Sequence, residues 1–241
     1  MTKPVTRSRI FVALDTVDLE HACRVARDLV GSVGGIKIGL ELYGAHGVEA
    51  ARRLAELGLP IFLDLKFHDI PNTIASAVRA VLPLKPALLT VHASGGPAML
   101  RAAAEAAAEA GEARPRIVAV TVLTSIDERD LGLVGQRKPL AAQVQRLAEL
   151  ALGAGIDGVV ASPQEVAKLR AKCGDGFLLV VPGIRPPWAA SGDQKRVMTP
   201  AEAIEAGADY LVIGRPITSA EDPRARVERI VAEIDGAPVP R

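Results

Sequence analysis

Three ionisable residues, Asp64, Lys66 and Asp69, fall within six positions of one another in the segment FLDLKFHDIPNT. They follow a short apolar run at residues 60–63, a pattern typical of a buried strand. Because side chains alternate along a strand, we expect Asp64 and Lys66 to face the same way. Ionised groups at the end of a core strand are costly unless they are paired. The spacing therefore indicates either a catalytic cluster of alternating charge or a structural ion pair that closes the strand.

The elements that must position these charges are eight short apolar runs, which alternate with longer helical patterns. The runs are rich in Val, Ile and Leu with little alternation, as expected of parallel strands buried on both faces. The predicted strands span residues 10–14, 35–38, 60–65, 87–91, 117–123, 158–161, 177–181 and 210–213. The predicted helices span residues 18–30, 41–57, 72–82, 96–110, 139–153, 163–172, 200–206 and 222–235. Asp18 and the pairs Ser162-Pro163 and Thr199-Pro200 supply residue types favoured at helix starts.

Eight strand–helix units in 241 residues predict one domain over residues 1–241, a (β/α)₈ or TIM barrel. An open doubly wound sheet is the alternative, but it normally carries a GxGxxG turn after its first strand. This chain has Leu14-Asp15-Thr16 there. Two polar segments, 125–139 and 182–197, have no predicted element, and long loops of this kind are usually functional.

Active sites of such barrels form at the carboxyl ends of the strands, so the residues that end each strand are the candidates. Asp15 ends the first strand, and Lys37 lies on the second. The third delivers Asp64 and Lys66, with Asp69 just beyond. An alternation of positive and negative groups keeps each of them ionised where the dielectric constant is low.

A second polar group follows the seventh and eighth strands and comprises Arg185, Gln194, Gly214 and Arg215. Barrels often bind phosphate at this place, through loop amides and the start of a short helix. Arg215 also offers a planar fork that suits phosphate oxygens. The pattern predicts a small phosphorylated substrate, with an ordinary surface arginine as the alternative for Arg215.

Composition limits the kinds of partner. The chain is 49% hydrophobic and 24% charged, with a formal net charge of +1 and only 3% aromatic residues. A nucleic-acid surface would need a basic stripe or stacking aromatic residues, so we expect no nucleic-acid partner. No run of about 18 apolar residues occurs, and the first apolar run is too short for a signal peptide. We therefore expect no membrane partner.

The two cysteines, Cys23 and Cys173, and the histidines show no metal-ligand spacing, and we expect no metal site. Sparse cysteine suits a reducing compartment, so the predicted location is the cytoplasm. We expect His68 and His92 to have structural roles. Trp188 is either a lid contact or a partly exposed aromatic residue.

Several motifs resemble those of the orotidine 5′-phosphate decarboxylase family. The segment DLKFHDIPNT is similar to the family's signature, and ALD, KIG, VLTS, VPGIRP, GDQKRVMTP and VIGRPI follow in the family's order. The resemblance covers nearly the whole chain and is closest to the shorter bacterial form, which has no fused phosphoribosyltransferase domain. One departure is Val181, where Thr often precedes the Pro-Gly pair.

The resemblance implies a homodimer with shared active sites. The family's charged tetrad falls on Lys37, Asp64, Lys66 and Asp69, with Asp69 supplied by the other subunit. Further substrate contacts fall on Asp15, Lys37, Asp64, Thr73 from the partner chain, Thr124, Ser125, Pro182, Arg185, Gln194, Gly214 and Arg215.

The resemblance also implies a reaction: conversion of orotidine 5′-phosphate to UMP and CO₂, the last step of de novo pyrimidine biosynthesis, without a metal or an organic cofactor. Lys66 would protonate a carbanion at C6 of the pyrimidine. Two alternatives stay open. One is a metal-dependent sugar-phosphate decarboxylase or aldolase that shares the Asp-x-Lys-x-x-Asp pattern and acts through an enediolate on Mg²⁺. The other is a non-catalytic nucleotide-binding barrel.

Overall fold

Eight parallel strands close into a barrel in chain order in the computed structural model, which describes residues 5–189 and 198–236. The barrel closes where β1 pairs with β8, with Ile10 opposite Leu211 and Val12 opposite Ile213. The strands are β1 (Ile10–Ala13), β2 (Gly35–Ile38), β3 (Ile61–Phe67), β4 (Leu88–His92), β5 (Arg116–Val120), β6 (Gly158–Val160), β7 (Leu178–Val181) and β8 (Tyr210–Ile213). The predicted (β/α)₈ barrel is confirmed.

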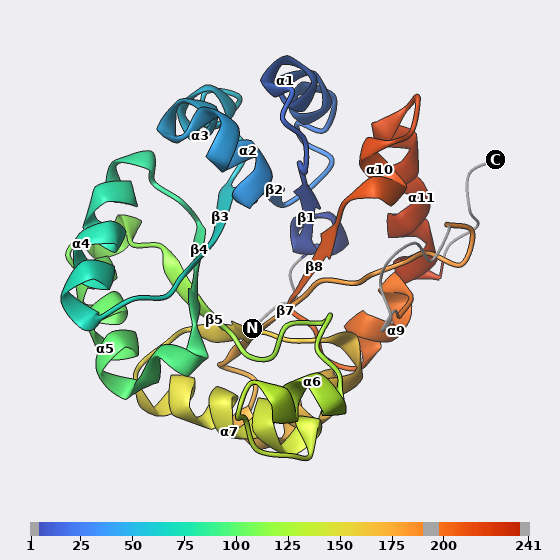
Figure 1. The fold of residues 1–241 in the computed structure, drawn as a ribbon. Coiled ribbons are helices and arrows are strands. Elements are labelled where there is room, and N and C mark those ends of the chain that lie inside the picture. Colours follow the sequence, from blue (N-terminus) through green and yellow to red (C-terminus); the bar gives the residue numbers. More distant parts are fainter. Residues whose placement is uncertain (1–4, 190–197, 237–241) are drawn as a thin grey trace.

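The α-helices surround the barrel, as Figure 1 shows along its axis. They are α1 (Leu19–Asp28), α2 (Leu40–His46), α3 (Val48–Ala55), α4 (Pro71–Val81), α5 (Gly96–Ala108), α6 (Glu128–Leu133), α7 (Leu140–Gly153), α8 (Val166–Cys173), α9 (Pro200–Glu205), α10 (Arg215–Thr218) and α11 (Pro223–Asp235). Short 3₁₀ turns lie at Thr6–Arg9, Leu82–Leu84, Ala93–Gly95, Gly111–Ala113 and Pro163–Glu165. No helix among the described residues is long and apolar enough to cross a membrane.

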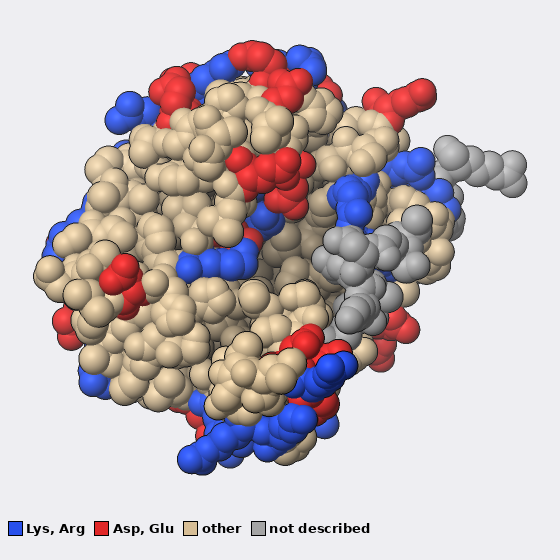
Figure 2. Space-filling model, in the orientation of Figure 1, with Lys and Arg blue, Asp and Glu red and all other residues tan. Residues whose placement is uncertain are grey.

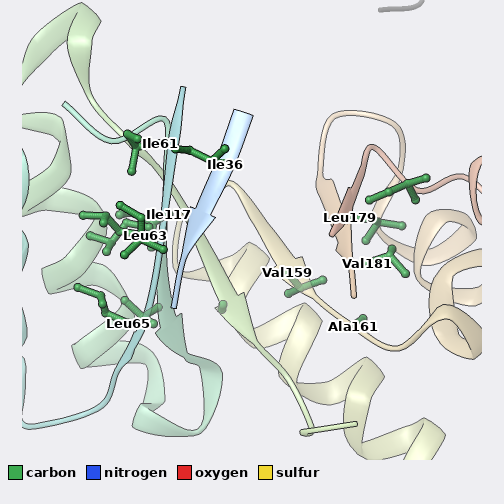
Figure 3. Close-up of a cluster of buried hydrophobic side chains, with 14 of the residues drawn as sticks. Ile36, Ile61, Leu63, Leu65, Ile117, Val159, Ala161, Leu179 and Val181 are labelled. Carbon is green, nitrogen blue, oxygen red and sulfur yellow. The ribbon is translucent and has the colours of Figure 1, made fainter. Parts of the chain in front are cut away.

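The strands are buried on both faces, which explains their unbroken apolar sequences. On the outer face Ile61, Leu63 and Leu65 lie along β3 toward the helices and belong to the main hydrophobic core (Figure 3). On the inner face Phe11 meets the rings of Phe62 and Tyr210 edge-on, with centroids 5.9 and 5.2 Å apart. This aromatic cluster fills the barrel interior, as layers of side chains do in such barrels.

Several segments differ from what the sequence predicts. At Ser162-Pro163 the chain forms the 3₁₀ turn Pro163–Glu165 without a side-chain cap from Ser162, and α8 begins only at Val166. The strand predicted over residues 117–123 ends at Val120.

The predicted helix over residues 41–57 is divided into α2 and α3 at Gly47, whose φ of +59° lies in the left-handed region. The polar segment 125–139, for which we predicted no element, contains α6. Asp127 caps that helix by accepting hydrogen bonds from the amides of Arg129 and Asp130, so a local capping signal was present.

The predicted helix starts at Asp18 and Thr199 are confirmed. The Asp18 side chain accepts a hydrogen bond from the His21 amide, 2.9 Å away. Thr199 and Glu202 form a reciprocal capping box at the start of α9, with Pro200 in the first turn.

Candidate active site

The carboxyl ends of the strands surround a hollow at one end of the barrel, which Figure 2 shows with acidic and basic atoms together inside it. The larger part has a volume of about 540 Å³ and is mainly polar. It adjoins a smaller, mainly apolar chamber of about 180 Å³. Lys37, Asp64 and Lys66 line both parts, so these charges lie where a polar cavity meets an apolar one.

Four of the predicted residues form a chain of alternating charge across β1, β2 and β3. Lys66 Nζ lies 2.8 Å from Asp64 Oδ2, and Lys37 Nζ lies 3.6 Å from the same oxygen. Lys37 Nζ also lies 3.0 Å from Asp15 Oδ1. The two middle members are the most buried: the side chains of Lys37 and Asp64 are 9% and 14% exposed, whereas those of Lys66 and Asp15 are 28% and 56% exposed. The expectation that Asp64 and Lys66 face the same way is confirmed.

The two ammonium groups determine the ionisation of Asp64. Burial alone would raise the pKa of this carboxyl, because a low dielectric constant disfavours the charged form. The positive charges of Lys37 and Lys66 oppose that effect, as do hydrogen bonds from Lys66 and Thr90. Together they hold the pKa of Asp64 below its ordinary value of 3.8, so the group is a carboxylate at neutral pH.

Strand β3 is irregular at the charged residues. Lys66 has a φ of +51°, a left-handed conformation that a residue with a side chain rarely adopts. The pairing with β4 shifts register between Leu63 and Phe67. Strain of this kind costs about 1–3 kcal/mol and is concentrated at functional sites. Thr90 of β4 hydrogen-bonds to both charged residues of this segment, and no motif in the sequence singles it out.

Gly39, directly after β2, is a second residue of the site that was not among the predicted ones. A Cβ atom at this position would lie 2.7 Å from Lys37 Nζ and 3.0 Å from Asp15 Oδ1. Such approaches are shorter than van der Waals contact, so a side chain at this position would require the Lys37 ammonium to move. The sequence did hold a clue to this role, because Gly39 ends the KIG motif that begins with Lys37.

The residues predicted near the phosphate also lie at the polar cavity. Arg185, Arg215, Pro182 and Gly214 all line it. Arg185 is only 9% exposed, and its amide donates a hydrogen bond to the Met198 carbonyl, 3.0 Å away. The two arginines thus come from β7 and β8 to one wall. Gln194 lies outside the described residues.

The apolar chamber lies on the β5 and β6 side of Lys66. Its walls include Phe62, Val120, Val160 and Val212 from the barrel strands. Thr124 lines this chamber and also a neighbouring outer pocket of about 390 Å³, which Ser125 lines as well. Thr124 therefore shares the apolar chamber with the charged residues, whereas Ser125 lines the outer pocket.

Asp69 and Thr73 stand apart from the cluster. Both are exposed, and neither lines the polar cavity or the apolar chamber. The Asp69 carboxylate accepts a hydrogen bond from the Ile70 amide at 2.6 Å, and no ion pair joins it to Lys66 in the described part of the chain. Ile70 is 67% exposed, so an apolar side chain lies uncovered between the two predicted residues.

His68 and His92 pack ring against ring beside the cluster, with centroids 5.3 Å apart. Burial, His68 and Lys66 lower the pKa of His92, which keeps its ring neutral at neutral pH. Trp188 anchors the loop after β7 to α11, because the guanidinium carbons of Arg226 and Arg229 lie 4.9 and 4.6 Å from its ring centroid. Within residues 5–189 and 198–236, no three His, Cys, Asp or Glu side chains are grouped to hold a metal ion.

Comparison with known proteins shows close relatives over the whole barrel. An orotidine 5′-phosphate decarboxylase of Rhodospirillum rubrum is 54% identical over 237 residues, which are 96% of this chain and 96% of the relative. An orotidine 5′-phosphate decarboxylase of Thermobifida fusca is 54% identical over 228 residues, which are 93% of this chain and 95% of the relative. The crystal structure of an orotidine 5′-phosphate decarboxylase from Lactobacillus acidophilus superposes with a TM-score of 0.82 at 39% identity, covering 94% of this chain and 98% of that one.

The family model described as "Orotidine 5'-phosphate decarboxylase / HUMPS family" matches residues 8–230, which include every strand of the barrel. That match and the relatives at about half identity agree with the motifs in the sequence. The chain belongs to the orotidine 5′-phosphate decarboxylase / HUMPS family.

Proposed function

We propose that this chain decarboxylates orotidine 5′-phosphate to UMP and CO₂, the last step of de novo pyrimidine biosynthesis. The observation that carries the proposal is the position of Lys66 Nζ, 2.8 Å from Asp64 Oδ2 at the boundary between the polar cavity and the apolar chamber. The pyrimidine occupies the apolar side and the ribose phosphate the polar side. Lys66 then faces the carbon that loses CO₂.

The chemical step leaves the electron pair of the broken C–C bond on C6 of the pyrimidine. The Lys66 ammonium stabilises this developing negative charge and then donates its proton to C6, so a new C–H bond forms. The neutral amine regains a proton from solvent. Apolar walls around the ammonium strengthen its electrostatic effect, because little water screens it. The carboxylate of Asp64 keeps Lys66 protonated and in place. No metal or organic cofactor takes part in this scheme.

Substrate recognition is divided between the two sides of the cavity. Arg185 and Arg215 bind the phosphate, with Pro182 and Gly214 shaping the backbone beside it. Asp15 and Lys37 contact the ribose hydroxyls, and Thr124 and Ser125 meet the pyrimidine side. Gln194, which lies outside the described residues, completes the phosphate site in this proposal.

The active enzyme is a homodimer in this proposal, with Asp69 and Thr73 reaching into the partner's site. The exposure of both residues and of Ile70 supports this arrangement, because an uncovered large apolar side chain is suited to an interface. A second carboxylate beside Lys66 would complete the alternation of charge that Lys37 and Asp64 begin. The free cysteines Cys23 and Cys173 are compatible with the cytoplasm, where this proposal places the protein.

The test is direct. Protein treated with EDTA is incubated with orotidine 5′-phosphate, and the loss of the substrate's ultraviolet absorbance is followed. We expect loss without added metal. An unchanged absorbance refutes the proposal, and loss only after Mg²⁺ is restored indicates the metal-dependent chemistry of the sugar-phosphate enzymes instead.

A further inference from the structure

We propose that Thr90 is a positioning residue, whose hydroxyl holds the Lys66 backbone and the Asp64 carboxylate in the geometry that the reaction requires. This residue lies on β4, between Leu89 and Val91, and carries the only hydroxyl in the run LLTVH. Its effect on turnover rests on the proposed function, whereas its effect on the Lys66 backbone does not.

The need for Thr90 arises from the break in the β3–β4 ladder. Leu63 pairs with Leu89, but the next residues that pair across the two strands are Phe67 and Val91. Three residues of β3, Asp64 to Lys66, therefore stand opposite the single residue Thr90. Extra residues in one strand leave backbone groups without a ladder partner, and an unpaired buried amide destabilises the fold.

The Thr90 hydroxyl takes the place of the missing ladder bond. The Lys66 amide donates to Thr90 Oγ1 over 2.8 Å. Thr90 Oγ1 in turn donates to Asp64 Oδ1 over 3.1 Å. A hydroxyl has one proton to donate and lone pairs to accept, and a carboxylate can only accept, so the direction of both bonds is fixed.

The two oxygens of Asp64 consequently have separate partners. Oδ1 receives the hydroxyl of Thr90, whereas Oδ2 faces Lys66 Nζ at 2.8 Å and Lys37 Nζ at 3.6 Å. Thr90 therefore sets the rotation of the carboxylate plane, and that rotation sets the position of the Lys66 ammonium. One side chain controls both ends of Lys66: its left-handed backbone and its charged tip.

Burial makes this role specific to the hydroxyl. Thr90 is 0% exposed, and its neighbours Leu89 and Val91 are also fully buried. Water cannot readily replace the hydroxyl at a closed position of this kind. Removing it leaves the Lys66 amide without its partner in an already strained conformation, and frees Asp64 to rotate.

The expected effect is on the chemical step. A misplacement of about 1 Å at a reacting group costs on the order of 10²-fold in rate. Thr90→Val, which keeps the shape but removes the hydroxyl, should lower kcat by roughly 10- to 100-fold. Binding of UMP and KM should change by less than about threefold, because the phosphate arginines and the apolar walls stay intact.

Two variants serve as matched controls. Thr90→Ser keeps the hydroxyl and should retain kcat within about threefold of the unaltered protein, since both hydrogen bonds remain possible. Thr121→Val removes another buried threonine hydroxyl, which donates to the Val160 carbonyl over 3.1 Å and touches none of the four charges. It should leave kcat unchanged.

The experiment measures kcat, KM and UMP affinity for the three variants, together with hydrogen exchange of the Lys66 amide by NMR. We expect Thr90→Val to lower kcat and to accelerate exchange at Lys66, with Ser restoring both. Unchanged kcat and unchanged exchange in Thr90→Val overturn the proposal. An equal loss of kcat in Thr121→Val, or no recovery in Thr90→Ser, also overturns it.

If Thr90→Val does not fold, Thr90→Ala is measured in its place. Absence of turnover in the unaltered protein refutes the proposed function, and the exchange of Lys66 still decides the role of Thr90.

Discussion

Lys66 Nζ lies 2.8 Å from Asp64 Oδ2, although the backbone between the two residues departs from regular strand geometry. In a regular strand these side chains would share a face by alternation alone. Here the ladder with β4 is broken and Lys66 is left-handed, yet the pair is retained at the barrel mouth. The contact is therefore made by a locally strained structure, which is how active sites often hold reacting groups.

Replacement of Lys66 by alanine should abolish turnover while leaving UMP binding measurable. The loss combines proton transfer and electrostatic stabilisation, each worth at least about 10²-fold, so we expect at least about a 10⁴-fold fall in kcat. Absorbance kinetics and calorimetric titration with UMP provide the two measurements. Lys85→Ala is the matched control, because Lys85 is also left-handed but exposed and away from the site. Retained turnover in Lys66→Ala would contradict the assignment.

The substitution Gly39→Ala should disrupt the pair between Lys37 and Asp15. The added methyl group would lie 2.7 Å from Lys37 Nζ, so the ammonium must move. We expect kcat/KM to fall by about 10-fold or more, since displaced contacts of this kind cost at least about 1.4 kcal/mol. Gly44→Ala in α2 is the control, because a Cβ there meets nothing within 4 Å and alanine favours a helix. Equal kinetics in the two variants would show that the clearance at Gly39 is unimportant.

Arg215→Ala should weaken recognition of the phosphate specifically. Hydrogen bonds to charged groups contribute about 1.5–3 kcal/mol, which corresponds to a loss of roughly 10- to 150-fold in kcat/KM for orotidine 5′-phosphate. The nucleoside orotidine lacks the phosphate and serves as the internal control, so its slow turnover should not change. If both substrates lose activity equally, Arg215 does not act through the phosphate.

Hybrid dimers test whether Asp69 acts across an interface. Lys66→Ala and Asp69→Ala are each expected to be inactive alone. When the two proteins are mixed and allowed to exchange subunits, one site of each hybrid would regain both residues. Random exchange in a twofold dimer should then restore about a quarter of the original activity. An inactive mixture, once mass spectrometry has shown that hybrids form, would place Asp69 in its own chain's site.

The lowered pKa of Asp64 predicts how stability depends on pH. Because its folded-state pKa lies below the ordinary value of 3.8, the unfolded chain takes up a proton first as the pH falls. The stabilisation is complete above about pH 5 and is lost as the pH falls through the folded-state pKa. Urea unfolding gives the free energy of unfolding of the unaltered protein and of Asp64→Asn between about pH 7 and pH 3. The difference between the two free energies should become smaller below about pH 4. A constant difference would mean that Asp64 is not the group involved.

The order of elements and most of the candidate site follow from the sequence alone. Apolar runs bounded by helix patterns specify eight strand–helix units, and Asp18 and Thr199 specify where two helices begin. Alternation along a strand predicts that Asp64 and Lys66 share a face, and the structure brings them together, although through an irregular strand. The rule that barrel sites form at strand ends then brings in Lys37 and Arg215. Each of these features is specified by residue types that lie close together in the chain, and such local patterns can be read directly from the sequence.

The tertiary structure alone identifies Thr90 and Gly39. The bond from Lys66 to Thr90 joins residues 24 positions apart, and it exists only because the register of β3 against β4 shifts at the charged residues. The need for glycine at position 39 likewise depends on where the Lys37 and Asp15 side chains meet after the barrel closes. Register and clearance between strands are set by packing across the whole barrel, so no local pattern of residue types encodes them.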